Sequence, residues 1–226
     1  IQIGGIGFMT LCISIMTVTK RKIGLVSRSL MQNSVSAPQI GGIVKMTKFI
    51  LVGTIVVEGT GALLLAFYFL PKYGFAKGIW FSIFHSISAF CNAGFDLMGS
   101  NTPFSSLTAE IGNWYVNLII MALIVIGGLG FFVWHDILET KFRFHNMKLH
   151  SKLVIFFTVC LIFGGGVLIF LCENGTASFE HLNVSEKIAA SMFQSVSART
   201  AGFNTIDLAA MTESGRFIIL VLMMIR

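Results

Sequence analysis

Two short glycine-containing strings have the residue types that could bind a bare cation. They are Asn92-Ala93-Gly94-Phe95 and Thr200-Ala201-Gly202-Phe203. A dehydrated cation needs several oxygen ligands at once, and closely spaced backbone carbonyls can supply them. Glycine permits the positive φ that turns successive carbonyls toward one axis, and a small alanine lets such a strand pack tightly. We therefore interpret the strings as two strands of an ion filter that acts mainly through the backbone, although each string alone would also fit a surface turn.

Each string follows an apolar segment that is too short to cross a bilayer. The segments are 78–90 and 186–198, whereas a spanning helix needs about 20 residues. Non-helical backbone survives at membrane depth only where protein buries it or where it lines a watery cavity. The pattern predicts pore loops at 78–96 and 186–204, each with a short helix, a glycine loop and a return to the same face.

The two predicted pore loops share an internal sequence repeat. Residues 84–89 (Phe-His-Ser-Ile-Ser-Ala) align with 193–198 (Phe-Gln-Ser-Val-Ser-Ala), and 93–96 align with 201–204. Apolar stretches often resemble one another by chance, but here serines and glycines recur at fixed positions before the same aromatic residue. An even number of predicted spans separates the loops, so the two units run parallel. A parallel repeat favours a channel-like axis over the inverted repeats of many carriers.

Three features beside the strings have two readings each. Arg199, directly before the second string, either braces the filter by donating to backbone carbonyls or is solvated in an outer vestibule. Glu58 lies in the middle of an apolar run, where a hydrogen-bonded structural role is favoured over ion binding. Small residues in membrane helices usually allow close packing, so packing is favoured over hinges for the glycine-rich runs. These runs are 4–7, 127–130 and 164–166.

The composition is that of a helical membrane protein. The chain of 226 residues is 55% hydrophobic and only 12% charged, with a mean hydropathy of +0.83, whereas soluble domains are about a quarter charged. Apolar runs predict full spans, the second of them ended by Pro71. The predicted spans are 1–18, 47–70, 111–133, 153–171 and one that starts at 216. Because the chain begins and ends near such runs, we expect it to be a portion of a longer protein.

The net charge of +6 reflects topology and not nucleic-acid binding. Ten of the sixteen basic residues lie in the segments 20–48 and 141–152, and short basic loops beside spans mark the cytoplasmic side. Acidic residues gather in the segments on the other side. Four cysteines, Cys12, Cys91, Cys160 and Cys172, have no metal-site or disulfide spacing. We therefore expect no nucleic-acid partner, no zinc site and no disulfide framework.

These motifs together resemble the Trk/Ktr/HKT superfamily of potassium transporters, and most closely the bacterial Ktr-type membrane subunit. The glycine strings also resemble the Thr-Val-Gly-Tyr core of potassium channel filters. The resemblance implies an all-α membrane protein of repeated span–pore-helix–span units around a pseudo-fourfold ion pore. It implies these boundaries: 1–19, the last span of unit one; 20–46, a cytoplasmic loop; 47–138, unit two with pore loop 78–96; 139–152, a cytoplasmic loop; 153–226, unit three with pore loop 186–204 and a truncated last span.

The resemblance implies potassium uptake through a channel-like pore in a bacterial inner (cytoplasmic) membrane. In plant relatives a serine at the filter position goes with sodium transport, so glycine at both Gly94 and Gly202 favours potassium. The transported K⁺ would be held by the filter residues, Na⁺ is a second possible ion, and no covalent cofactor is expected. Implied partners are membrane lipid, a second copy in a homodimer and a cytoplasmic nucleotide-binding regulatory subunit.

Other functions of this class remain open at this point. A sodium-coupled or sodium-permeable transporter of the same superfamily is the main alternative, and a carrier for an organic solute is the weaker one. An enzyme is not expected, because the sequence has no zinc-protease motif, no nucleophile elbow and no paired intramembrane carboxylates.

Overall fold

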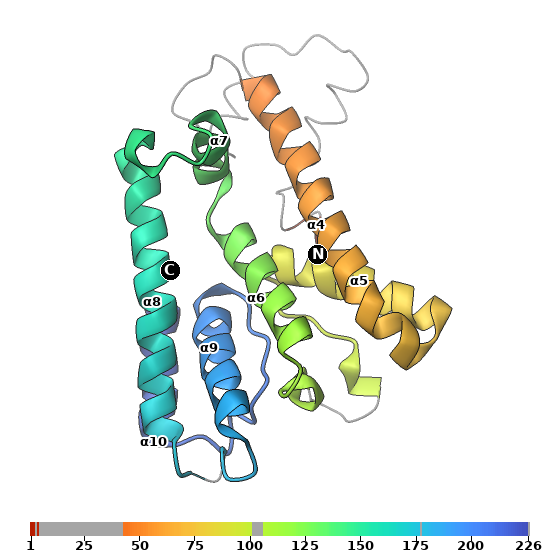
Figure 1. Cartoon of the computed structure of the whole chain (residues 1–226), viewed down its shortest axis with the longest axis vertical. Coiled ribbons are helices and arrows are strands. Elements are labelled where there is room, and N and C mark those ends of the chain that lie inside the picture. Colours follow the sequence, from red (N-terminus) through yellow and green to blue (C-terminus); the bar gives the residue numbers. More distant parts are fainter. Residues whose placement is uncertain (3, 5–42, 101–105, 177, 226) are drawn as a thin grey trace.

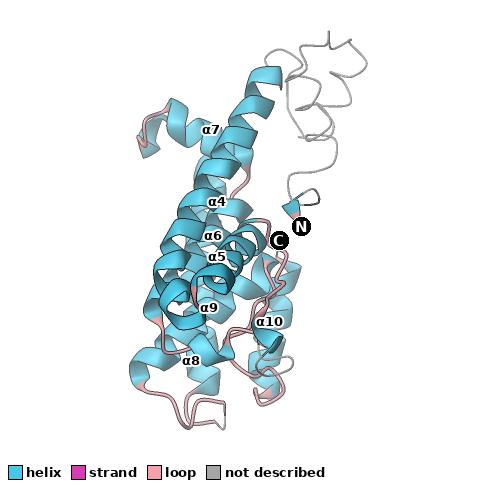
Figure 2. Cartoon of the chain, turned by 90° about the vertical axis from the view of Figure 1, so that its right-hand side faces the viewer, coloured by secondary structure: helices cyan, strands magenta, loops and turns pink. Residues whose placement is uncertain are grey.

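The described part of the chain is helical. The computed structural model describes residues 1, 2, 4, 43–100, 106–176 and 178–225, and these residues form helices and loops without a strand (Figure 2). The α-helices are α4 (Ile43–Tyr73), α5 (Phe75–Phe90), α6 (Trp114–Gly128), α7 (Phe131–Glu139), α8 (Leu149–Glu173), α9 (Val184–Thr200) and α10 (Glu213–Met224). Three single 3-10 turns join them: η1 (Met98–Ser100), η2 (Thr108–Glu110) and η3 (Phe144–Asn146). The predicted first span, 1–18, and most of the basic segment 20–48 lie outside the described residues.

Two of the described helices have the length and composition of membrane spans. They are Lys48–Tyr73 within α4, and α8. Both exceed the roughly 20 residues that a bilayer requires, and they confirm the spans predicted at 47–70 and 153–171. Pro71 does not end α4 at once, because it lies inside the last turn and the helix continues to Tyr73. Gly74, with φ +80°, then turns the chain into α5.

The span predicted as one helix over 111–133 is broken. It forms α6 and α7, which are bent by 93° relative to each other. Gly130 at the break has φ +85°, a conformation that favours glycine, and nothing lies within 4 Å of the position where its Cβ would be. The Trp134 indole donates across the bend to the carbonyl of Ile126, at 2.8 Å. The region predicted as a span is therefore not one straight helix, and Gly130 lies at the bend instead of at a packing contact.

The two short predicted segments are helices that do not lead straight to the next span. Segment 78–90 lies in α5 and segment 186–198 lies in α9, each followed by an irregular stretch. Figure 1 shows that the chain leaves the end of α8, rises through α9 and returns through a loop to the same end of the molecule before α10 starts. Helix α9 packs against α6, α8 and α10, so three helices contact it.

The same kind of hydrogen bond ties each short helix to the long helix that precedes it. In α5, the Ser86 hydroxyl donates to the backbone carbonyl of Glu58 in α4, at 2.7 Å. In α9, the Ser195 hydroxyl lies 3.1 and 3.0 Å from the carbonyls of Leu161 and Ile162 in α8. Both serines are fully buried. These bonds satisfy hydroxyls that would otherwise be costly to bury.

Glycines on the long helices make this close approach possible. A Cβ added at Gly61 would lie 2.6 Å from the Ser86 hydroxyl oxygen and would also press on a leucine of α6. A Cβ added at Gly165 would meet the Ser195 hydroxyl and a leucine of α10. Small residues allow the backbones of membrane helices to approach one another closely. The packing role predicted for run 164–166 is confirmed at Gly165.

We predict that Gly165→Ala destabilises the full-length protein, while Gly164→Ala does not. The added methyl group at 165 overpacks the junction of α8, α9 and α10, at a cost of about 1–3 kcal/mol. At Gly164 the Cβ position has no neighbour within 4 Å, and alanine favours the helix. Thermal unfolding in detergent measures both variants. Equal midpoints for the two variants would contradict the close packing at Gly165.

Candidate functional site

Each glycine string is folded back onto the short helix before it. The Ser88 hydroxyl donates to the backbone carbonyl of Phe95, at 2.7 Å, and the Ser197 hydroxyl donates to that of Phe203, at 2.5 Å. Both serines are buried and occupy equivalent positions of the repeated Ser-x-Ser-Ala string. One hydroxyl therefore fixes the far end of each string.

The backbone of both strings takes the conformation that the glycines predict. Gly94 has φ +69° and Gly202 has φ +84°, the region that L side chains rarely adopt. Asn92 also has a positive φ, +52°, and asparagine is one of the few other residues that tolerate it. The amides of Ala93 and Gly202 close tight turns onto the carbonyls of their helices, Ser88 and Ser197, at 2.9 and 3.1 Å.

The structure brings the two strings into direct contact. A Cβ on Gly94 would strike the backbone carbonyl oxygen of Ala201 and would lie 3.2 Å from the carbonyl carbon of Gly202. Beside this contact, the Thr200 hydroxyl donates to the side-chain oxygen of Asn92, at 3.0 Å. Residues more than 100 positions apart in the sequence are thus in direct contact. Glycine is required at position 94 because a side chain there would overlap the Ala201 carbonyl.

Several carbonyls of the strings keep their acceptor capacity. Among the hydrogen bonds of the described residues, none is accepted by the carbonyls of Ala93, Gly94, Ala201 or Gly202. The carbonyls of the following phenylalanines are used by the serines, as described above. Oxygens with free lone pairs are what a cation site of backbone carbonyls requires. The two phenylalanine side chains differ: Phe95 is 61% exposed and Phe203 is fully buried.

Helix α6 lies against the start of both strings. A Cβ on Gly127 would overlap the carbonyl of Phe90, the last residue of α5. A Cβ on Gly128 would lie 3.8 Å from both the Asn92 amide nitrogen and the Thr200 hydroxyl. The predicted packing role of run 127–130 is therefore confirmed at Gly127, immediately before the bend at Gly130.

Among the described residues, Arg199 makes no hydrogen bond to the strings. Within the described part of the chain, its Nε is buried and has no hydrogen-bond partner, and no bond to a carbonyl of the strings is found. The side chain instead lines a cavity of about 20 Å³ together with Thr158, Gly128 and Thr200, and this volume holds one water molecule. The bracing bonds are thus not observed.

Glu58 is held by neighbours at the start of the first string. Its carboxylate accepts a hydrogen bond from the Gln2 amide, at 2.7 Å, and lies 3.7 Å from the Cys91 sulfur. The side chain is 7% exposed. These partners fit the hydrogen-bonded structural role that the sequence favours.

The sequence does not predict the roles of Ser88 and Ser197. It marks them only as repeated residues, and their partners depend on how each loop turns back.

Comparison with known proteins agrees with this arrangement. Residues 1–226 match the sequence profile of the TrkH family, described as cation transport proteins. The chain belongs to the TrkH cation transport family. Over its whole length it is 39% identical to the potassium/sodium uptake protein NtpJ of Enterococcus hirae and 39% identical to the Ktr system potassium uptake protein B of Bacillus subtilis. It is 34% identical to the Ktr system potassium uptake protein D of Bacillus subtilis.

The chain covers 49–50% of these three relatives, and thus spans about half their length. Family membership confirms the predicted resemblance and the prediction of a cation transport protein in a bacterial plasma membrane. The two long apolar helices of the described residues agree with this location.

We predict that Ser88→Ala and Ser197→Ala each destabilise the full-length protein by about 1–3 kcal/mol, because each removes a buried hydroxyl that holds a loop carbonyl. Ser191→Ala is the matched control on α9, since its hydroxyl only reaches the carbonyl of Lys187 one turn back. Thermal unfolding of the three variants tests this prediction. It is contradicted if Ser191→Ala costs as much as the other two.

Proposed function

We propose that this chain contributes two strands of the selectivity filter of a potassium uptake pore. The strands are Asn92-Ala93-Gly94-Phe95 and Thr200-Ala201-Gly202-Phe203. The observation that carries the proposal is the backbone contact between the strings, with Gly94 against the Ala201 carbonyl. Two loops that approach so closely, each fixed by a serine and each with unused carbonyl oxygens, have the properties of neighbouring walls of one ion path.

The proposed architecture is a ring of repeated units around a pseudo-fourfold axis. Unit two would be 47–138 with pore loop 78–96, and unit three 153–226 with pore loop 186–204, while 1–19 would close unit one. The recurring serine bonds and glycine contacts of α5 and α9 support this division. Two further units from the rest of the protein would complete the filter.

The proposed mechanism requires no covalent chemistry. A K⁺ ion loses water as it enters, and carbonyl oxygens replace that hydration shell. The positive-φ backbone at Gly94 and Gly202 orients these oxygens, and the membrane potential drives the ion inward. Moving one charge across 100 mV is worth about 2.3 kcal/mol. Arg199, directly before the second strand, would support the filter from the cavity that it lines with Thr158 and Thr200.

Potassium is the favoured ion, and sodium is the second candidate. Two of the similar proteins are named for potassium uptake, whereas NtpJ is named for potassium and sodium. Glycine at both filter positions fits potassium. A sodium-permeable or sodium-coupled pore would keep the same fold and differ in the spacing of the carbonyls.

The proposed partners follow from the Ktr names and the charge distribution. Two of the relatives are named as proteins of a Ktr system, which supports a further component, proposed to be a cytoplasmic nucleotide-binding regulatory subunit. A second copy in a homodimer is proposed from the family resemblance alone. The segment 141–152 carries exposed Lys141 and Arg143 beside exposed Phe142 and Phe144. It could dock such a subunit or rest on acidic lipid headgroups.

We predict that Gly202→Ser lowers the K⁺:Na⁺ uptake ratio of the full-length protein by roughly tenfold, an effect of the size expected for one well-placed ligand group. The measurement is ion uptake into cells that lack their own potassium transporters. Gly175→Ser is the matched control. Gly175 has φ +91°, and neither glycine has an atom within 4 Å of its Cβ position, so the two serines carry the same backbone strain. An equal ratio in Gly202→Ser and Gly175→Ser, at equal protein levels, would refute the filter.

A further inference from the structure

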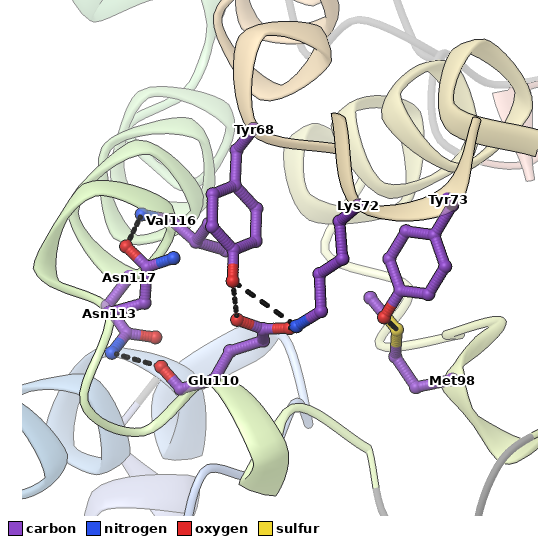
Figure 3. Close-up of polar contacts among 8 residues, drawn as sticks. All are labelled: Tyr68, Lys72, Tyr73, Met98, Glu110, Asn113, Val116 and Asn117. Carbon is purple, nitrogen blue, oxygen red and sulfur yellow. Dashed lines mark hydrogen bonds and ion pairs between the residues drawn. The ribbon is translucent and has the colours of Figure 1, made fainter. Parts of the chain in front are cut away.

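A buried carboxylate is clamped at the end of α4 where α5 begins. Figure 3 shows the side chains of Tyr68 and Lys72 converging on Glu110, which is 3% exposed. The Tyr68 hydroxyl donates to one carboxylate oxygen of Glu110, at 2.6 Å. The Lys72 ammonium forms an ion pair with the other oxygen and also donates to the Tyr68 hydroxyl, at 3.2 Å. Glu110 is buried while the Lys72 side chain is 39% exposed. Removing Lys72 would leave the buried carboxylate without its counter-charge, so the clamp formed by Tyr68 and Lys72 fixes the position of Glu110.

The clamp holds a short backbone segment, 106–110, in place. The Asn117 amide donates to the Glu110 carbonyl, at 3.1 Å, and the Glu110 amide donates to the carbonyl of Leu107, at 2.9 Å. Leu107 is fully buried and belongs to the same apolar core as Phe203. The segment is therefore anchored to α4 and α6 at one end and enters the core at the other.

The free edge of this segment pairs with the backbone just after the second glycine string. The Leu107 amide donates to the Asn204 carbonyl, at 2.9 Å. The Asn204 amide in turn donates to the Ser106 hydroxyl, at 3.2 Å. Asn204 directly follows Phe203, so two hydrogen bonds fix the residue next to the end of the string.

The same stretch of chain also contacts the beginning of α9. The Trp114 indole donates to the Ser185 hydroxyl, at 2.9 Å. A Cβ on Gly112 would lie 2.8 Å from a carboxylate oxygen of Glu186. Residues 106–114 thus touch the predicted loop 186–204 where it starts and where it ends, although they precede it by about 80 residues in the sequence.

We propose that Lys72 and Glu110 are positioning residues that set the ion selectivity of the neighbouring unit's filter strand, Thr200–Phe203. The clamp on α4 fixes segment 106–110, and this segment fixes Asn204 and therefore the carbonyls before it. The inference rests on the proposed filter function. Carbonyl ligands discriminate between ions by their spacing, and a misplacement of about 1 Å far from a reacting centre can cost roughly a hundredfold in rate.

The test uses Lys72→Met and Glu110→Gln in the full-length protein, with K⁺ and Na⁺ uptake measured separately. Each variant breaks the ion pair. We expect the K⁺:Na⁺ uptake ratio to fall by roughly tenfold, which is a smaller effect than the roughly hundredfold loss of rate for a misplaced reacting group. Lys72→Arg retains the charge and should keep the ratio. Lys77→Met and Glu180→Gln are the matched controls, because both side chains are exposed, and they should leave it unchanged.

Uptake is normalised to the amount of protein in the membrane, so that loss of folding is separated from loss of selectivity. If the surviving Lys72→Met and Glu110→Gln proteins keep the ratio of the two controls while Gly202→Ser loses it, the positioning role is wrong and the filter stands. If Gly202→Ser also keeps the ratio, the proposed function itself is wrong.

Discussion

Polar backbone that is kept away from water needs a partner for each group, and this constraint governs the whole arrangement. The loops after α5 and α9 are irregular, and their backbone cannot rely on helical hydrogen bonds. Ser88 and Ser197 satisfy one carbonyl of each loop, and Asn204 is satisfied from segment 106–110. Among the hydrogen bonds of the described residues, none is accepted by the carbonyls of Ala93, Gly94, Ala201 or Gly202. These carbonyls belong to the stretches where the two strings meet, with Gly94 against the Ala201 carbonyl.

Close approach of the elements is the second requirement, and glycine supplies it. Gly61 and Gly165 let the short helices lie against the long ones, and Gly127 lets α6 rest on the end of α5. Gly94 accommodates the carbonyl of Ala201. At these positions a methyl group would displace backbone or a buried hydroxyl. The glycines therefore couple membrane packing to the geometry of the loops.

The sequence predicts the long helices, the two short ones and the meeting of the glycine strings, since each depends on local composition and on a repeat. It does not predict the break at Gly130, because a glycine in an apolar run looks the same whether it packs or bends. It does not decide between the two readings of Arg199, because the surroundings of this side chain come from α6 and α8. The Lys72–Glu110 clamp joins residues that are 38 positions apart in the sequence. No local pattern links these two residues, so the sequence does not predict their contact.

The most direct measurement of the central claim is the position of a heavy potassium analogue in the full-length protein. Crystals of the whole transporter soaked in thallium(I), which has nearly the radius of K⁺, would reveal the ion by its anomalous scattering. The account predicts peaks within coordination distance of backbone oxygens in both 92–95 and 200–203, on one common axis. Thallium peaks that avoid both strings, or strings that open onto separate surfaces, would contradict it.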